Sequence, residues 1–202
     1  MLDRLKNRIC HIIYVPFFAR DICFCFLKRL PWHISWRFWG LPFVQRVRKS
    51  RILIGTHFTA CSMSSHNSIG VMQRVILKTN SPHASLVIGH HVGISGSSIA
   101  ATNRIEIGNY VLIGSGCLIT DSDAHPIGLM DRRDNRACKT APIMIEDDVF
   151  IGARSIILKG VRIGRGSVIG AGSVVTTDIE PFVVAAGNPC KVIRSIPEKG
   201  GE

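Results

Sequence analysis

Aliphatic side chains return at every sixth position through the last third of the chain. The longest run, without an interruption, is Ile145, Ile151, Ile157, Ile163, Ile169 and Val175. The same step occurs upstream, from Ile88 to Ile94 and from Ile107 to Ile119. This spacing fits neither an amphipathic helix, with its period of about 3.6, nor hairpins with turns every 8–12 residues or so. It predicts short strands joined by tight turns, each with one aliphatic side chain pointing inward.

Glycines follow several of these aliphatic positions, at Gly152, Gly164 and Gly170. A residue without a Cβ allows the backbone to turn where a side chain would clash. Each hexapeptide is therefore expected to form one side of a triangular coil, and stacked coils would form parallel strands around a column of Ile and Val. A β-sandwich with a chance period is the alternative. Residues 52–87 look like earlier, less regular coils.

Two segments depart from the repeat. The interval from Ile119 to Ile145 is 26 residues, one step plus twenty, and its polar, proline-containing sequence predicts an excursion loop over 120–144. Residues 1–51 lack the repeat and concentrate the aromatic residues, which predicts an amphipathic, helical arm. The expected organisation is thus an arm (1–51), an all-β solenoid (52–194) and a C-terminal tail (195–202).

The positive charge of the chain is concentrated in the predicted arm. The whole sequence of 202 residues has a net charge of +11, from 25 Lys and Arg against 14 Asp and Glu. Residues 1–51 hold eleven basic and two acidic side chains (+9), so that 14 minus 12 leaves only +2 for residues 52–202. This asymmetry argues against a nucleic-acid groove along the fold, and no nucleic-acid partner is expected. Two interpretations of the arm stay open: a cap on the open end of the solenoid, or a contact with an anionic membrane surface.

Cysteine usage and the N-terminal residues bear on the compartment. Seven cysteines, an odd number without metal-type spacing, indicate reduced thiols in a cytoplasmic protein. The apolar stretch from Ile9 to Leu27 is interrupted by Pro16, Arg20 and Asp21, so neither a signal peptide nor a spanning helix fits it well. We expect a cytoplasmic protein, placed on the inner face of the membrane if the arm binds lipid.

His125 is the most informative single residue, because it lies in the excursion loop within Asp-Ser-Asp-Ala-His-Pro (121–126). A histidine titrates near neutral pH and can take a proton from a hydroxyl or an amine as that group attacks a carbonyl carbon. A carboxylate at its other ring nitrogen would fix the tautomer, and Asp121 and Asp123 are both candidates for that role.

The second half of the chain resembles the hexapeptide-repeat acyltransferases of the galactoside, maltose and xenobiotic O-acetyltransferase type. The segments that carry the resemblance are Ala-His-Pro-Ile at 124–127, Pro-Ile-Met-Ile at 142–145, Asp-Val-Phe-Ile-Gly-Ala at 148–153, Gly-Val-Arg-Ile-Gly at 160–164, Ser-Val-Ile-Gly-Ala-Gly-Ser-Val-Val-Thr at 167–176 and Gly-Asn-Pro-Cys-Lys-Val-Ile-Arg at 187–194. Val-Gly-Ile-Ser-Gly at 92–96 also resembles the branch associated with surface polysaccharides.

The resemblance implies a left-handed parallel β-helix, a homotrimer with active sites in the clefts between subunits, and acetyl-CoA as co-substrate. His125 matches the family's catalytic base, and Ser95 falls at an acceptor-binding position. The residues that match the coenzyme cleft are Phe150, Ala153, Ala171, Thr176, Lys191 and Arg194. Thr177 and Ala153 depart from a frequent lysine and a frequent serine, so the identity of the acceptor does not carry over.

The expected function is direct transfer of acetyl from acetyl-CoA to a hydroxyl of a sugar or glycan, without an acyl-enzyme. An N-acetyltransferase of an amino-sugar nucleotide, an antibiotic acetyltransferase and an acyl-carrier-protein-dependent lipid enzyme remain alternatives, and a lipid-linked glycan is a plausible acceptor. A zinc hydratase of the gamma carbonic anhydrase type is less favoured, because neighbouring His90 and His91 would point in opposite directions on a strand. No metal is expected. A non-enzymatic scaffold is the remaining alternative.

Overall fold

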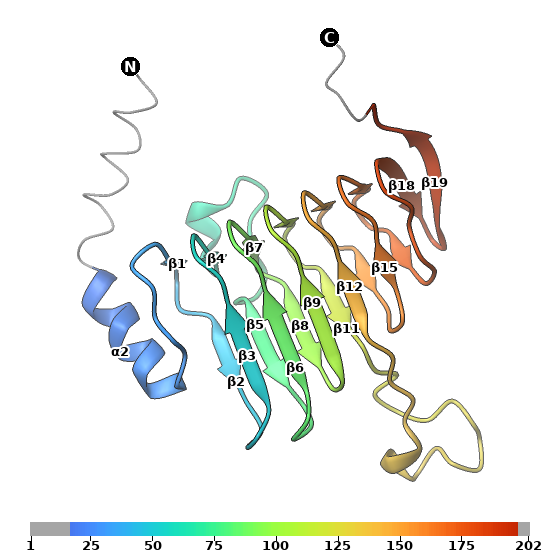
Figure 1. Ribbon diagram of the computed structural model, residues 1–202, viewed down its shortest axis with the longest axis horizontal. Coiled ribbons are helices and arrows are strands. Elements are labelled where there is room, and N and C mark those ends of the chain that lie inside the picture. The colour runs from blue at the N-terminus through green and yellow to red at the C-terminus, as the bar shows by residue number, and fades with distance from the viewer. Residues whose placement is uncertain (1–16, 198–202) are drawn as a thin grey trace.

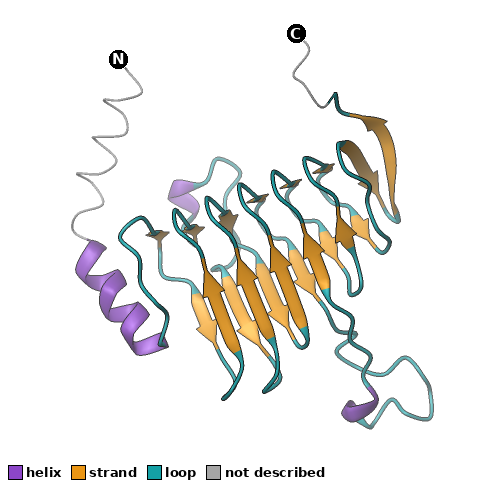
Figure 2. Cartoon of the chain, in the orientation of Figure 1, coloured by secondary structure: helices purple, strands orange, loops and turns teal. Residues whose placement is uncertain are grey.

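Short parallel strands wind around one core to form a three-sided column (Figures 1 and 2). The structure is a computed structural model, and it describes residues 17–197. Sheet A contains β1 (Arg37–Trp39), β4 (Thr59–Cys61), β7 (Gly93–Ser95), β10 (Leu112–Ile113), β13 (Phe150–Ile151), β16 (Val168–Ile169), β18 (Val183–Gly187) and β19 (Cys190–Ser195). Sheet B contains β2 (Phe43–Gln45), β5 (Ile76–Thr79), β8 (Ser98–Ala101), β11 (Leu118–Thr120), β14 (Ile156–Ile157) and β17 (Val174–Val175). Sheet C contains β3 (Arg51–Ile54), β6 (Ser85–Ile88), β9 (Arg104–Ile107), β12 (Ile143–Ile145) and β15 (Arg162–Ile163).

The chain visits the three sheets in turn, and equivalent strands of successive coils pair in parallel register. Ile113, for example, lies between Ile94 and Ile151 in sheet A. The aliphatic positions of the hexads are all buried, with Ile119 and Ile157 fully inaccessible to solvent. The prediction of a hexapeptide solenoid is therefore confirmed, and the fold is a parallel β-helix with three sheets.

The turns between the sheets form three edges, which are named here by the sheets they join. The AB edge consists of residues 40–42, 62–75, 96–97, 114–117, 152–155 and 170–173. The BC edge consists of residues 46–50, 80–84, 102–103, 121–142, 158–161 and 176–178. The CA edge consists of residues 55–58, 89–92, 108–111, 146–149 and 164–167. Two of these turns are long: 62–75, with the short helix η2 (Ser64–His66), and the excursion loop, with η3 (Asn135–Ala137).

The column begins earlier than the predicted boundary at residue 52. Strand β1 pairs with β4, and β2 pairs with β5, so residues 37–45 already belong to the first coil and not to a helical arm. Trp36, Phe38 and Val44 fill the core there. The hexad is not visible there because bulky aromatic side chains take the place of Ile and Val in the core of the first coil.

The helix α2 (Phe18–Lys28) covers the open end of the first coil (Figure 1). Its inner face buries Phe24 and Cys25, and the Phe24 ring meets Phe38 edge to face at 5.9 Å between centroids. Arg20 Nη2 donates a hydrogen bond of 2.7 Å to Phe38 O. Part of the predicted arm thus acts as a cap, whereas residues 1–16 lie outside the described residues.

At the other end, β18 extends sheet A and β19 turns back antiparallel to it. Ser195, the first residue of the predicted tail, is the last residue of β19. Within residues 17–197, no helix combines the length and the apolar character that crossing a membrane requires. The six described cysteines are free thiols: Cys23, Cys25, Cys61, Cys117, Cys138 and Cys190.

Candidate active site

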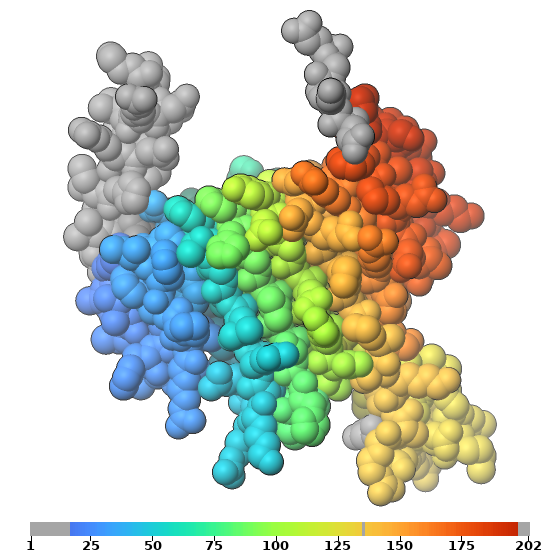
Figure 3. All heavy atoms as spheres, viewed as in Figure 1, coloured from blue at the N-terminus to red at the C-terminus, as the bar shows by residue number. Residues whose placement is uncertain are grey.

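The excursion loop leaves the column at the BC edge, between β11 and β12, and projects away from the body of the molecule (Figures 1 and 3). An isolated antiparallel bridge between Ser122 and Thr140 closes its neck. The Asp123 N–H donates to Lys139 O at 3.2 Å, and the Ala141 N–H donates to Asp121 O at 3.0 Å. The loop is therefore anchored at its base while its tip extends into solvent.

His125 lies just beyond this neck and is exposed. Ala124 has a φ of 62°, a left-handed conformation that turns the chain sharply before the histidine, and Pro126 on the other side is buried. The His125 ring forms no hydrogen bond with residues 17–197. An exposed imidazole with free nitrogens can accept a proton from a bound substrate, as a general base must.

Asp121 does not meet His125. The carboxylate is fully buried, and its two oxygens accept the backbone N–H groups of Thr102 at 2.7 Å and Asn103 at 2.8 Å. Burial raises the pKa of Asp121, although these hydrogen bonds act to lower it. Both oxygens of Asp121 thus bind the turn of the preceding coil, so that of the two predicted candidates for orienting the histidine only Asp123 has an oxygen without a partner among the described residues.

Asp123 has a different environment, two residues from His125. Its Oδ1 pairs with Lys159 Nζ at 2.6 Å, and both side chains are mostly buried, 18% and 27% exposed. Its Oδ2 is also buried but has no partner among the described residues. Asp123 therefore has one buried oxygen without a partner among the described residues, at the base of the loop. Lys159 stands in the next coil, at the turn after Ile157, and nothing in the linear sequence marks it as a partner of Asp123.

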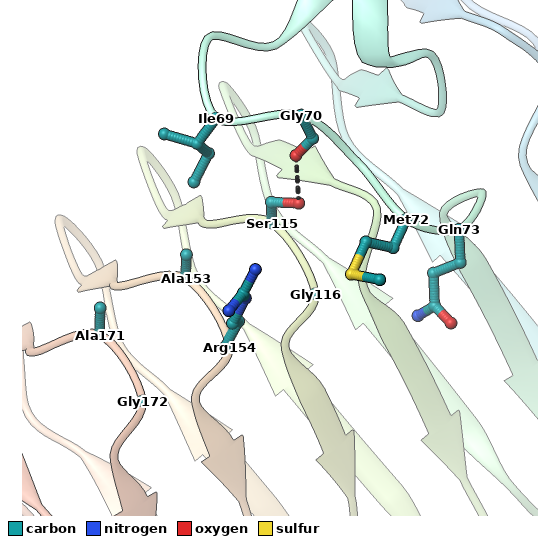
Figure 4. A pocket seen from close by; sticks show the side chains of 10 residues that line it. All are labelled: Ile69, Gly70, Met72, Gln73, Ser115, Gly116, Ala153, Arg154, Ala171 and Gly172. Atoms are coloured by element: carbon teal, nitrogen blue, oxygen red, sulfur yellow. Dashed lines mark hydrogen bonds between the residues drawn. The ribbon is translucent and has the colours of Figure 1, made fainter.

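A groove of ≈ 660 Å³ lies on a different edge of the column, the AB edge (Figure 4). Stacked turns of three successive coils form its floor, and residues from the long turn 62–75 lie over it. It is lined by Ile69, Gly70, Met72, Gln73, Ser115, Gly116, Ala153, Arg154, Ala171 and Gly172. The Ser115 hydroxyl donates to Gly70 O at 2.7 Å and ties the overlying segment to the floor.

Two of the predicted cofactor-binding residues, Ala153 and Ala171, line this groove. Their backbone N–H groups donate no hydrogen bond to any residue in 17–197. The floor therefore offers small apolar side chains together with unpaired donors, which suits an extended ligand that carries amide carbonyl groups. The overlying segment Ile69–Gln73 could not be identified from the sequence, because it comes from a coil far earlier in the chain.

The other predicted site residues are spread over the column. Phe150 is 45% exposed on sheet A, and Ser95 is half-buried at the end of β7 in the same sheet. Lys191 and Arg194 are exposed on β19 at the end of sheet A. Thr176 is exposed on the BC edge, the edge from which the His125 loop departs. One chain therefore separates the histidine from the groove by the width of sheet B.

The histidines of the CA edge do not converge on one point. His90 Nδ1 accepts from the Thr56 N–H at 3.0 Å, while the His91 ring stacks between His57 at 4.3 Å and Tyr110 at 4.7 Å. Within residues 17–197 there is no group of three His, Cys, Asp or Glu side chains arranged to hold a metal ion. This geometry does not favour the zinc-hydratase alternative.

Residues 142–177 match the family model described as the hexapeptide repeat of succinyl-transferase. The chain is 48% identical over 92 residues to the galactoside O-acetyltransferase of Lactococcus lactis subsp. lactis, which is 46% of this chain and 44% of that protein. It is 59% identical over 58 residues to the 2,3,4,5-tetrahydropyridine-2,6-dicarboxylate N-acetyltransferase of Clostridium perfringens, 29% of this chain and 25% of that one. The chain thus spans less than half the length of the curated relatives it matches.

Among solved structures, the chain is similar to a hexapeptide-repeat acetyltransferase of Vibrio cholerae that was determined in complex with acetyl coenzyme A. The TM-score is 0.54 with 28% sequence identity, over 76% of this chain and 72% of that one. The chain is therefore a left-handed β-helix of hexapeptide repeats, similar to the acetyltransferases that are built on this fold.

Proposed function

We propose that this protein is an acetyl-CoA-dependent O-acetyltransferase that acts on a hydroxyl of a sugar or glycan. One observation carries the proposal: an exposed histidine stands on the excursion loop of a column that resembles, over three quarters of the chain, an acetyltransferase bound to acetyl coenzyme A. A solvent-facing imidazole without partners in residues 17–197 suits a base that must reach a hydroxyl from outside the fold.

The groove on the AB edge is the proposed site for the pantetheine arm of the co-substrate. The unpaired N–H groups of Ala153 and Ala171 can donate to the carbonyls of that arm, and the small side chains leave room for it. Lys191 and Arg194, exposed on β19, supply positive charge for its phosphates. Phe150 and Thr176 remain proposed contacts of the coenzyme cleft.

We further propose that the active enzyme is a homotrimer. His125 departs from the BC edge and the groove lies on the AB edge, so one chain alone does not join them. A cyclic assembly that apposes the BC edge of one subunit to the AB edge of the next would complete each site.

In the proposed reaction, His125 takes the proton of the acceptor hydroxyl as the oxygen attacks the thioester carbonyl carbon. A backbone N–H in the groove, such as that of Ala153, stabilises the resulting oxyanion. The C–S bond then breaks, the ester is released, and the imidazolium returns its proton to the leaving thiolate. Asp123, with one oxygen free, is the proposed group that orients the ring.

Ser95 is proposed to contact the acceptor. N-acetyl transfer is a second candidate, since a 58-residue segment is also 59% identical to an N-acetyltransferase. Coils that O- and N-acetyltransferases share are suited to bind their common donor, acetyl-CoA. Residues outside these coils would then determine which acceptor binds. A lipid-linked glycan and a cytoplasmic location belong to the same proposal.

The test is the turnover of acetyl-CoA with a panel of sugars, glycans and amino-sugar nucleotides, followed by mass spectrometry. His125→Asn is expected to lower kcat about 10²–10⁴-fold, the usual contribution of a general base, with little change in CoA binding. His83→Asn, an exposed histidine on the same edge, is the control and should keep wild-type turnover. Near-normal turnover by His125→Asn would show that His125 is not the base. Loss of CoA binding in both variants would instead show that the variants are misfolded.

A further inference from the structure

The outer face of α2 carries an apolar stripe that residues 17–197 do not cover. Its members follow one another at helical spacings of three and four: Ala19, Ile22, Cys23, Phe26 and Leu27. Phe26 is 82% exposed and Leu27 is 77% exposed. The opposite face of the helix already buries Phe24 and Cys25 against the first coil. A helix that only caps the column should be polar on its outer face, so this stripe indicates a second partner.

The stripe runs into a basic hollow. Leu27 lines a cavity of ≈ 760 Å³ between the end of α2 and the turn 46–50 of the first coil. Five basic side chains share its lining, and no acidic one does: Lys28, Arg29, Arg46, Arg48 and Lys49. All five are exposed, and none forms an ion pair with a described residue.

Several basic side chains elsewhere on the column are paired with carboxylates. Arg104 pairs with Glu106, Arg162 with Glu146, and Lys159 with Asp123, among others. At the α2 end, by contrast, five unpaired cations share one hollow that no acidic side chain lines, next to exposed aromatic and aliphatic side chains. This combination is typical of segments that lie on an anionic bilayer, with the apolar residues in the interface and the basic residues at the headgroups.

We infer that the α2 end of the column is a docking surface for an anionic phospholipid bilayer. Phe26 and Leu27 enter the interfacial region, while the basic residues of the hollow contact lipid phosphates. A soluble phosphate or a nucleic acid would use the basic residues but would leave the apolar stripe in water. The bilayer is the partner that accounts for both halves of the surface. One helix then serves as cap and as membrane contact, through opposite faces.

A cyclic trimer, as proposed above, presents the same end of every subunit in the same direction. Three copies of the surface would then engage one membrane plane together, and each bound copy would raise the effective concentration of the next. The docking surface itself does not depend on the acetyltransferase proposal, since it uses no residue of that site.

The test is co-sedimentation of the full chain with vesicles of phosphatidylglycerol and phosphatidylcholine in equal amounts, against vesicles of phosphatidylcholine alone. The protein should bind the anionic vesicles and be released by salt. Arg46→Gln/Arg48→Gln should lower the partition coefficient about 30-fold, at about fivefold for each basic residue near the surface. Phe26→Ser/Leu27→Ser should lower it by at least about tenfold, also at high salt.

Arg132→Gln/Arg133→Gln is the matched control, because it removes the same charge from exposed positions of the excursion loop. It should bind as the wild type does, and all variants should melt alike because their changed side chains are exposed.

Equal binding to both kinds of vesicle, or wild-type binding by Arg46→Gln/Arg48→Gln, would overturn the inference. So would calorimetric binding of inorganic phosphate without vesicle binding, which would assign the hollow to a soluble anion. A changed sedimenting mass for Phe26→Ser/Leu27→Ser without a change in vesicle binding would assign the stripe to a second copy of the chain.

Discussion

Asp121 and Asp123 stand two positions apart, and the column uses them differently. The first accepts two backbone N–H groups of the preceding coil, while the second reaches forward to Lys159 in the following coil. Their spacing in the sequence made them equal candidates for orienting His125. Only the stacking of coils distinguishes them, because it decides which backbone groups face each carboxylate.

Lys159 is expected to hold the base of the excursion loop. Lys159→Met removes the cation from a mostly buried carboxylate, which should lower the free energy of unfolding by about 1–3 kcal/mol. It should also lower kcat about tenfold, because the loop that carries His125 loses an anchor. Lys159→Arg should restore most of both quantities. Urea unfolding and steady-state kinetics measure the two effects.

The control for this prediction is the Arg136–Asp134 pair, which lies exposed on the same loop. Arg136→Met should leave stability and turnover nearly unchanged, since exposed ion pairs contribute little. Equal effects of the two methionine substitutions would argue against a special role for Lys159.

At the scale of the elements, the tight turns depend on the approach of neighbouring coils. A Cβ added at Gly152 would lie 2.5 Å from Ala171 N, whereas one at Gly172 would meet nothing within 4 Å. Gly172 has a φ of 73°, so alanine there is strained but not crowded. Gly152→Ala should cost about 3 kcal/mol of stability and Gly172→Ala about 1 kcal/mol, as measured by urea unfolding. The reverse order would contradict the stacking of these turns.

The orientation of α2 can be tested through two of its cysteines. Cys25 is buried, and burial together with the charge of Asp21 raises the pKa of its thiol to about 12. At pH 8 only about one Cys25 thiol in ten thousand is then ionised, and the thiolate is the reactive form. Cys23, on the outer stripe, is exposed.

Iodoacetamide labelling at pH 8, mapped by mass spectrometry, should therefore modify Cys23 at least about a hundredfold faster than Cys25. Equal rates in the folded protein would show that α2 does not pack as described. Protection of both thiols would show that another segment covers the stripe, and it would also count against the membrane contact.

Much of the column could be predicted from the sequence because a buried aliphatic every six residues is a local signal. The first coil could not, since Trp36 and Phe38 replace the aliphatic residues of the repeat there. The groove could not be predicted either. Its lining joins Met72 with Ala171, which are far apart in the chain and meet only because coils stack. His125 could be singled out from its loop, but its distance from the groove could not.

At the scale of the whole molecule, the separation of His125 from the groove predicts complementation between subunits. His125→Ala subunits keep an intact groove, and Ala153→Trp subunits keep an intact histidine. When the two inactive variants are refolded together in equal amounts, random trimers should recover about a quarter of the wild-type activity, because one ordered pair of neighbours in four is intact. Steady-state assay of the mixture measures this recovery. A mixture that stays inactive would place each complete site within one chain.

Because successive coils pair as parallel strands, each coil adds a fixed length to the column. In sheet B, three steps separate β2, at the α2 end, from β11, where the loop of His125 departs. At about 4.8 Å for each step, the loop leaves roughly 14 Å above the first coil. The column thus acts as a spacer whose length is set by the number of coils. Adding or removing one coil between β2 and β11 would shift the histidine by one such step, and with it the depth at which a surface-bound acceptor could be reached.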